Sequence, residues 1–260
     1  MRYRQLFWLS LLAALAVPRS VSAGCPEVYL DGAQPEPAVG LVELCAEGFS
    51  DLWDPTARTV RYGSEVLYAD RLRAPGRPDR ERLFHEDSRL SVANRVSPDA
   101  LVGSGYDRGH VVPAGDMATP EAMLHSFSMA NVVPQNSSNN RGPWSRIEEA
   151  TRSLVVSVFR GRGYVVTGPI YWGDAARVGT MLVPQKLFKA VYVQGDAFGN
   201  PDVAGAWVVE NADDPKTTFV PLAYLRDMYG VDAFPSLPEG VKSVAKLPDA
   251  VAAHTGARLR

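Results

Sequence analysis

The sequence predicts an α+β domain, in which a mixed or antiparallel sheet packs against one long helix. The helix is expected over residues 143–160, where apolar residues recur at helical spacing. Runs of β-branched and aromatic residues lie before it, at 58–70, and after it, at 164–170, 188–193 and 206–210. The 260 residues are enough to bury a large core around such a sheet.

The start of the chain has the pattern of a secretory signal peptide. A basic start precedes an apolar run over residues 6–17, and small residues end at Ala23. A transmembrane anchor is the alternative, but this run is shorter than the roughly 20 residues that span a bilayer. We therefore expect a signal peptide over 1–23, a single domain over 24–260, and a secreted or periplasmic protein without stable membrane insertion.

The balance of charges is close to neutral. The whole chain has 27 basic and 29 acidic residues, and cleavage near Ala23 would remove three arginines and no acid. The mature chain would then carry a net charge of about −5. Such a balance argues weakly against nucleic-acid binding, but the local distribution of arginines matters more than the net charge.

Only two cysteines are present, Cys25 and Cys45. In an oxidising compartment they are expected to form one disulfide, whose loop of about 20 residues contributes on the order of 3 kcal/mol. The alternative is a lipoprotein in which Cys25 is acylated after cleavage. The preceding Ser22-Ala23-Gly24 lacks the Leu or Val that is usual three positions before a lipid-bearing cysteine, and Cys45 would stay unpaired.

The first half of the chain is expected to combine loop-rich segments with one pair of strands. Residues 24–50 are interpreted as loop-rich because of their prolines, and 58–70 as two paired strands around Gly63. The basic segment 71–82 follows, and its simplest interpretation is a solvated connection. Its arginines are Arg71, Arg73, Arg77, Arg80 and Arg82.

The second half is more regular. A short helix is expected over 120–128. The long helix over 143–160 starts with Pro143, which suits a first helical position, and stops before Gly161, which suits a C-terminal cap. The strands named above follow, and the Pro-rich tail after Tyr229 supports no prediction of its elements.

One histidine lies in a segment that suits phosphodiester hydrolysis. Residues 106–110 read Tyr-Asp-Arg-Gly-His, which places Asp107, Arg108 and His110 close together. An imidazole can take a proton from water near neutral pH, and a guanidinium can bind two phosphate oxygens. Gly109 lets the backbone come close to its neighbours. No such setting surrounds His85, His125 or His254.

A second polar cluster lies at the start of the long helix. Asn140 comes just before the predicted helix, and Glu148 and Arg152 lie on successive turns of one face. Mg²⁺ prefers oxygen ligands and often has few protein ligands. From spacing alone, two simpler interpretations stay open: Asn140 as a helix cap, and Glu148 with Arg152 as a surface ion pair.

Together these residues resemble the DNA/RNA non-specific endonucleases with a ββα-metal site, a family that includes endonuclease G-like and secreted bacterial nucleases. The resemblance rests on Asp-Arg-Gly-His at 107–110, followed by Asn140, Trp144 and Glu148. It implies a ββα-metal nuclease fold, in which the long helix carries metal-site residues. The similarity covers roughly residues 44–230, with supporting matches at 131–135, 167–169 and 184–192.

The resemblance implies a role for each residue of the motif. His110 would be the general base, and Asn140 the one direct protein ligand of the metal. Glu148 would hold water of the metal's hydration shell, while Arg108 and Arg152 would contact phosphate oxygens. The metal, Mg²⁺ or Mn²⁺, would polarise the scissile phosphate and stabilise the leaving 3′ oxygen.

Further residues complete the expected site. Asp107 is assigned to the catalytic set, and Arg141, Gln135 and Asn131 are expected to contact substrate. Attack by an external water needs no 2′-hydroxyl, so DNA and RNA are both expected substrates, with 5′-phosphate products implied by the family. Contacts to phosphate carry little sequence information, which predicts low specificity.

Other functions find less support. The sequence indicates no oligomeric state, and it lacks both the Gly-x-Ser-x-Gly segment of serine hydrolases and the His-Glu-x-x-His segment of zinc peptidases. A catalytically silent, secreted nucleic-acid-binding module is the alternative to an enzyme. Binding alone would need neither His110 nor Asn140, so the sequence favours the nuclease.

Overall fold

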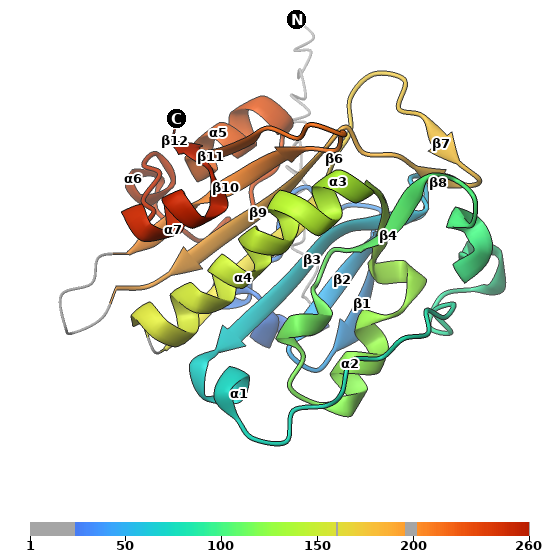
Figure 1. The fold of residues 1–260 in the computed structure, drawn as a ribbon, viewed down its shortest axis with the longest axis horizontal. Helices are drawn as coiled ribbons and strands as arrows, with labels where there is room; N and C mark the ends of the chain where they lie inside the picture. Colours follow the sequence, from blue (N-terminus) through green and yellow to red (C-terminus); the bar gives the residue numbers. More distant parts are fainter. Residues whose placement is uncertain (1–23, 160, 196–201, 260) are drawn as a thin grey trace, which may run out of the picture.

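The computed structural model describes residues 24–159, 161–195 and 202–259, so the predicted signal peptide lies outside the described residues. An eight-stranded sheet in the order β1-β2-β3-β6-β9-β10-β11-β12 forms the centre (Figure 1). Adjacent strands of this sheet are antiparallel except for β11 and β12, which are parallel. The strands span Val42–Ala46, Phe49–Asp54, Thr59–Tyr68, Arg162–Ile170, Lys186–Val193, Val203–Glu210, Thr217–Val220 and Arg258–Leu259.

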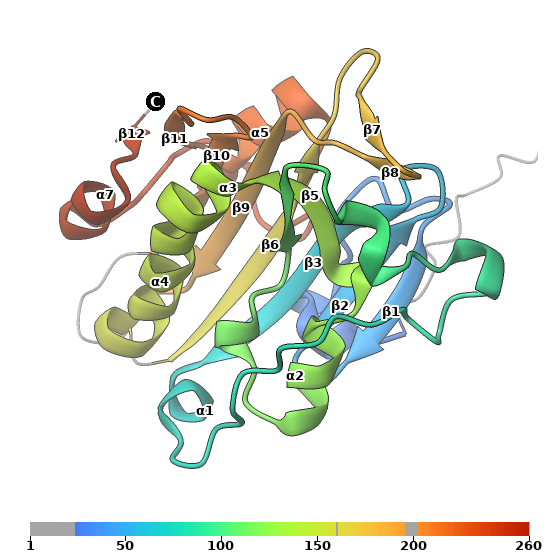
Figure 2. The same ribbon diagram turned by 45° about the vertical axis from the view of Figure 1, so that its right-hand side comes forward.

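Helices cover both faces of the sheet. One face packs against a long helical segment that contains α3 (Ser137–Asn139) and α4 (Ser145–Ser153), with α7 (Asp249–Thr255) beside it (Figures 1 and 2). Trp144 and Ile147 of that segment join one core with Trp207 of β10. The other face packs against α5 (Leu222–Tyr229), whose Leu225 joins a second core. This two-sided sheet confirms the α+β prediction.

The long helix begins earlier than the sequence indicated. It comprises α3 (Ser137–Asn139), a wider turn over Asn140–Trp144, α4 (Ser145–Ser153) and a last stretch that ends at Phe159. Asn136 caps it, because its side chain accepts a hydrogen bond from the Ser138 amide. Pro143 is therefore inside the segment, and Gly142 (φ −107°, ψ −110°) makes the break that accommodates it.

The region expected to hold two paired strands is one strand, β3. Gly63 lies in its middle, opposite Asp51 of β2 and Thr167 of β6. A Cβ atom there would lie 2.5 Å from a methyl carbon of Val112, so the glycine serves close packing instead of a turn. The later strand predictions are confirmed as β6, β9 and β10, each with wider bounds.

A smaller two-stranded unit lies on the face that carries the long helix. β4 (Tyr106–His110) pairs antiparallel with β5 (Val132–Asn136), and α2 (Pro120–Ser126) lies between them in sequence. The expected short helix over 120–128 is thus confirmed, and the Thr119 hydroxyl caps it. Because β5 leads directly into α3, the two strands and the helical segment form one ββα unit.

The N-terminal and C-terminal regions are more ordered than expected. Residues 24–50 contain β1 and the start of β2, and Cys25 and Cys45 form the predicted disulfide. That bond uses both sulfur atoms, so Cys25 is not available for acylation. The tail forms α6 (Glu239–Lys242), α7 and β12. Among the described helices, none has the length and apolar character to cross a membrane.

Candidate active site

A groove of about 540 Å³ lies between the β4 strand and the long helical segment. β4 contributes Asp107, Arg108 and His110, and the helical segment contributes Asn140, Arg141 and Glu148. Two sequence clusters that are some thirty residues apart therefore meet, because β5 returns antiparallel to β4 and leads into the helix (Figure 2). The remaining lining residues are Arg80, Phe84, Pro113, Ala114, Gly115 and Ser145.

The β4 strand is closely packed at Gly109. A Cβ atom there would lie 2.1 Å from Oε1 of Gln135, so no larger residue fits without moving β5. Arg108 and His110 flank this glycine and point to the same side of the strand. The Arg108 Nε donates to the Pro98 carbonyl at 2.9 Å, and its guanidinium lies 5.4 Å from the Phe84 ring centre.

His110 is held between two aromatic rings. The ring centres of Phe84 and Phe127 lie 5.0 and 4.7 Å from the imidazole centre. Burial and the positive charge of Arg80 together lower the pKa of His110 to about 3, and burial has the larger effect. The ring is thus neutral at pH 7, and its Nε2 accepts no hydrogen bond from a described residue.

A neutral imidazole in this place can act as a proton acceptor. An arriving phosphate anion would offset the charge of Arg80 and raise the pKa of His110 toward the range that suits a general base. The flanking rings restrict the orientation of the imidazole. These features agree with the role that the sequence motif implies for His110.

Asp107 positions its neighbours instead of facing the groove as a free carboxylate. It accepts hydrogen bonds from the Asn140 Nδ2 at 2.9 Å and the Ser137 hydroxyl at 3.0 Å. Arg141 donates to it twice, from Nε at 2.9 Å and Nη2 at 2.7 Å. Burial raises the pKa of Asp107, but the hydrogen bonds from Arg141, Asn140 and Ser137 outweigh it and hold the pKa below its usual value.

Asn140 is a candidate metal ligand because of this arrangement. Its backbone is helical (φ −56°, ψ −47°), so it lies within the helical segment and is not the cap that spacing alone allowed. Asp107 takes the amide nitrogen, which leaves the Oδ1 atom without a hydrogen bond to a described residue. By binding the nitrogen, the Asp107 carboxylate orients the Asn140 side chain so that its oxygen is available to a cation.

Glu148 supplies the second oxygen donor. It is half-buried in the groove and makes no hydrogen bond or ion pair with a described residue. Burial raises the pKa of Glu148 to about 7, against the opposing charge of Lys189. One amide oxygen and one carboxylate, both unengaged in one groove, fit a divalent cation such as Mg²⁺ or Mn²⁺ that keeps several waters.

The expected ion pair between Glu148 and Arg152 is absent from the described residues. The Arg152 Nη1 instead donates to Oδ1 of Asp116 at 2.8 Å, and it lies against the backbone at Gly115. Arg152 is not among the residues that line the groove. The expectation that Arg152 contacts phosphate therefore does not match this arrangement, in which Asp116 holds the guanidinium.

Two expected substrate contacts are also wrong, because both side chains are fully buried. The Asn131 amide donates to the carbonyls of Val112 and Ser126 and accepts from the Val112 amide, so all of its bonds serve the fold. Gln135 packs under Gly109. Arg141, by contrast, is exposed and lines the groove, as a substrate contact requires.

The sequence interpretation missed Arg80. It belongs to the segment that was interpreted as a solvated connection, yet it lines the groove and lies 5.3 Å from the Phe127 ring centre. The density of arginines over 71–82 was a signal, but their spacing could not show which one turns inward. Arg80 therefore adds a cation next to His110.

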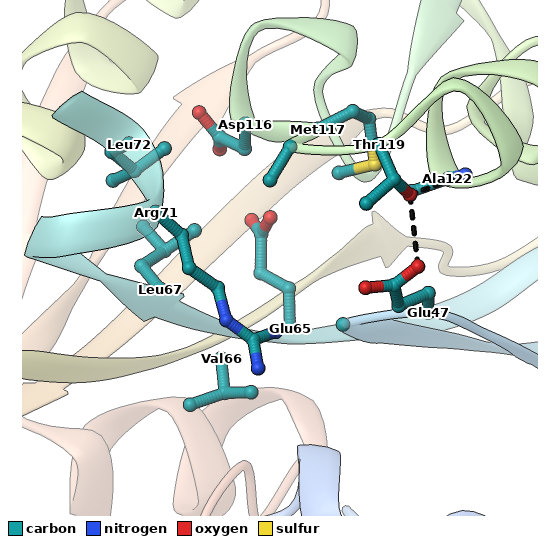
Figure 3. Close-up of a pocket in the computed structure, with 12 residues that line it drawn as sticks. Glu47, Glu65, Val66, Leu67, Arg71, Leu72, Asp116, Met117, Thr119 and Ala122 are labelled. Atoms are coloured by element: carbon teal, nitrogen blue, oxygen red, sulfur yellow. Dashed lines mark hydrogen bonds between the residues drawn. The ribbon is translucent and has the colours of Figure 1, made fainter. Parts of the chain in front are cut away.

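A buried charged cluster lies beneath the helical segment. The Lys189 Nζ donates to the Thr167 hydroxyl at 2.8 Å and lies 3.7 Å from a carboxylate oxygen of Glu65. Figure 3 shows the Glu65 carboxylate pointing from β3 toward the segment that carries Asp116. Burial and the Asp116 charge hold the pKa of Glu65 well above its usual value, and Lys189 opposes this shift. Only 1% of either Glu65 or Lys189 is exposed.

The ββα unit and its groove define the class of protein. The chain belongs to the DNA/RNA non-specific endonuclease family, whose sequence profile matches residues 35–240. This range extends beyond the 44–230 that the motifs indicated. The recognition of the family from the Asp-Arg-Gly-His motif is thus confirmed.

Individual relatives are similar over parts of their length. The mitochondrial nuclease EXOG of Xenopus laevis is 31% identical over 204 residues, which are 71% of this chain and 56% of that protein. Nuclease C1 of Cunninghamella echinulata var. echinulata is 34% identical over 176 residues, 62% of this chain and 68% of that protein. Mitochondrial endonuclease G of Homo sapiens is 34% identical over 134 residues, 51% of this chain and 44% of that protein. The chain spans about half the length of the EXOG proteins of Xenopus laevis and Danio rerio.

A solved structure supports the same fold. The structure described as an EndoG/EndoGI complex superposes with a TM-score of 0.67 at 22% identity, covering 76% of this chain and 88% of that chain. At 22% identity, this similarity shows that the two proteins share a fold. The ββα-metal architecture that the motifs implied is confirmed.

Proposed function

We propose that this protein is a metal-dependent endonuclease that hydrolyses phosphodiester bonds of both DNA and RNA. The observation that carries the proposal is the single groove that holds the neutral His110, the free oxygens of Asn140 and Glu148, and several cations. A base, an oxygen-donor site and phosphate-binding guanidinium groups are the parts that phosphodiester hydrolysis needs.

The side chains suggest a division of labour. His110 accepts a proton from the water whose oxygen forms the new bond to phosphorus. The P–O3′ bond breaks, the leaving 3′ oxygen takes a proton from water to become a 3′-hydroxyl, and the other product keeps a 5′-phosphate. Arg80 and Arg108 attract the substrate phosphate and stabilise its growing negative charge. A divalent cation held by Asn140 and Glu148 would act as a Lewis acid toward the phosphate and the leaving oxygen.

Low specificity follows from the kinds of contact available. The cations of the groove recognise phosphate, which is the same at every position of the chain. An external water as nucleophile makes the 2′-hydroxyl unnecessary, so RNA and DNA are both substrates. Arg141 lines the groove with 74% of its side chain exposed, so a polymer in solution can reach the groove at this residue.

We also propose that the protein acts outside the cytoplasm. The basic and apolar start of the sequence and the Cys25–Cys45 disulfide support export through a cleaved signal peptide. Mass spectrometry of the protein from the periplasm and the medium would give the mature N-terminus. A chain that starts at Met1 in the soluble cytoplasmic fraction would contradict this proposal.

One set of reactions tests the enzymatic function. Purified protein should cut plasmid DNA and RNA in the presence of Mg²⁺ or Mn²⁺, and EDTA should stop the reaction. Asn140→Ala should lose cleavage and bind Mn²⁺ more weakly in calorimetry, with its melting temperature little changed because Asn140 is not the helix cap. Binding of nucleic acid without any cleavage under these conditions would instead support the silent binding module.

A further inference from the structure

A second groove lies beside the first, on the other flank of the same helical segment. Its volume is about 470 Å³. Pro143 and Arg146 of the helical segment form one wall, whereas Asn140, Arg141 and Ser145 of the same segment line the catalytic groove. The opposite wall is the end of the sheet that carries β11 and β12, which Figure 2 shows next to the helical segment.

Three cations line this second groove without counter-ions. Arg146, Lys216 and Arg258 are all exposed, and none has an ion pair or a side-chain hydrogen bond to a described residue. Asp214 is the one acidic residue in the lining, so the groove has an excess of two positive charges. This excess stands out in a chain whose formal net charge is −2.

Several other arginines of the described chain are paired with carboxylates. Arg141 binds Asp107, Arg152 binds Asp116, and Arg226 binds Glu239. Paired guanidinium groups of this kind have already lost part of their capacity to bind an anion. The unpaired cations of the second groove keep their full charge for a ligand.

Two of the cations lie on regular elements, and the third lies next to one. Arg146 lies in α4, and Arg258 lies in β12, opposite Thr218 of β11 in the sheet register. Lys216 directly precedes β11, and its backbone amide is hydrogen-bonded to Glu210. Three positive charges from separate elements thus face one space without needing a loop to reorganise.

We propose that the second groove binds the phosphodiester backbone of the substrate, away from the scissile bond. The inference rests on the proposed nuclease function. A nucleic acid carries a phosphate at every nucleotide, so a strand held in the catalytic groove continues past the helical segment. The unpaired cations on the far flank attract that continuing backbone, and the Thr217 and Thr218 side chains provide further polar contacts.

The experiment uses two charge-matched triple variants. The test variant is Arg146→Gln, Lys216→Gln and Arg258→Gln. The control variant is Arg71→Gln, Arg162→Gln and Lys246→Gln, which removes the same charge at exposed positions that line neither groove. Melting temperatures of both variants show that each is folded before any comparison.

Cleavage is measured on single-stranded DNA of about four and about 30 nucleotides at several salt concentrations. For the long substrate, the test variant should raise KM about tenfold or more and flatten the slope of log KM against log salt by about 2. The kcat and all values for the short substrate should stay the same. The control variant should match the wild type on both substrates.

Direct binding keeps the proposal separate from the proposed function. Fluorescence anisotropy of the 30-nucleotide DNA, with EDTA present, should show the same loss of affinity in the test variant. If the wild type cleaves nothing, the nuclease proposal fails, yet this binding measurement still tests the groove. An unchanged affinity, or an equal loss of affinity for inorganic phosphate alone, would overturn the backbone proposal.

Discussion

The open catalytic groove and the buried cluster beneath it use the same kinds of side chain under opposite conditions. In the groove, His110, Asn140 and Glu148 have polar atoms that bind no described residue. In the cluster, Lys189 lies against Glu65 and Thr167, with about 1% of the lysine exposed. The groove leaves polar groups available to a substrate, whereas in the cluster the Lys189 ammonium is engaged by Thr167 and Glu65.

This difference shows that the contribution of an ion pair to stability depends on how deeply the pair is buried. In the pair of Arg141 and Asp107, 74% of the Arg141 side chain is exposed to water, and such an ion pair contributes little to stability. The Arg152 and Asp116 pair has an almost fully buried carboxylate, so losing either partner would leave a charge without compensation. Glu148 of the groove is affected by both regions. Burial raises the pKa of Glu148, and the positive charge of Lys189 from the cluster lowers it.

The largest expected effect concerns the buried cluster. Lys189→Met should lower the free energy of unfolding by about 3 kcal/mol or more, because Glu65 loses its buried counter-charge. Urea denaturation measures this. Lys186→Met is the matched control, since Lys186 lies on the same strand but is only half-buried, and it should change stability by less than about 1 kcal/mol. The double variant Glu65→Leu with Lys189→Met should recover part of the loss. Equal losses of stability in the two single lysine variants would contradict the prediction that the buried contacts of Lys189 stabilise the fold.

The next effect concerns catalysis in the open groove. His110→Ala should reduce kcat by about 10² to 10⁴ while the protein stays folded. His125→Ala is the control, because His125 is half-buried but lies outside the groove. Activity is measured on plasmid DNA and stability by thermal melting. Near-normal cleavage by a folded His110→Ala variant would remove His110 from its role as the base.

A smaller effect is expected from pH at a third site, the buried carboxylate Asp87. Burial raises the pKa of Asp87, but hydrogen bonds from Arg89 and Ser128 outweigh it and lower the pKa to about 2. The folded pKa is below the unfolded one, so this group stabilises the fold above about pH 4 and loses that contribution as the pH falls toward 2. Wild type should exceed Asp87→Asn in stability, on the order of 2 kcal/mol at pH 7, with the difference shrinking below pH 4. A difference that is constant from pH 7 to pH 3 would contradict this assignment.

The smallest effect should come from the exposed ion pair. Arg141→Gln should change the free energy of unfolding by less than about 1 kcal/mol, because 74% of the Arg141 side chain is exposed to water. Its larger consequence should be a higher KM for nucleic acid, since Arg141 lines the catalytic groove. A stability loss as large as that of Lys189→Met would remove the contrast between the two regions.

The sequence by itself determined what depends on local patterns and on motif chemistry. It predicted the α+β class, the strands β6, β9 and β10, the disulfide, and the residues that meet in the groove, namely His110, Asn140 and Glu148. These predictions succeed because strand periodicity, a single possible cysteine pairing and a specific motif are all written in residue types and spacing.

Tertiary structure decided where each polar side chain points and what pairs with it. Asn131 and Gln135 turn inward, Arg152 binds Asp116 instead of Glu148, and Arg80 enters the groove from a segment interpreted as solvated. Each outcome depends on a neighbour that is distant in sequence, so spacing along the chain could not reveal it. Burial then sets the charge state, because the cost of removing a polar group from water depends on the whole fold around it.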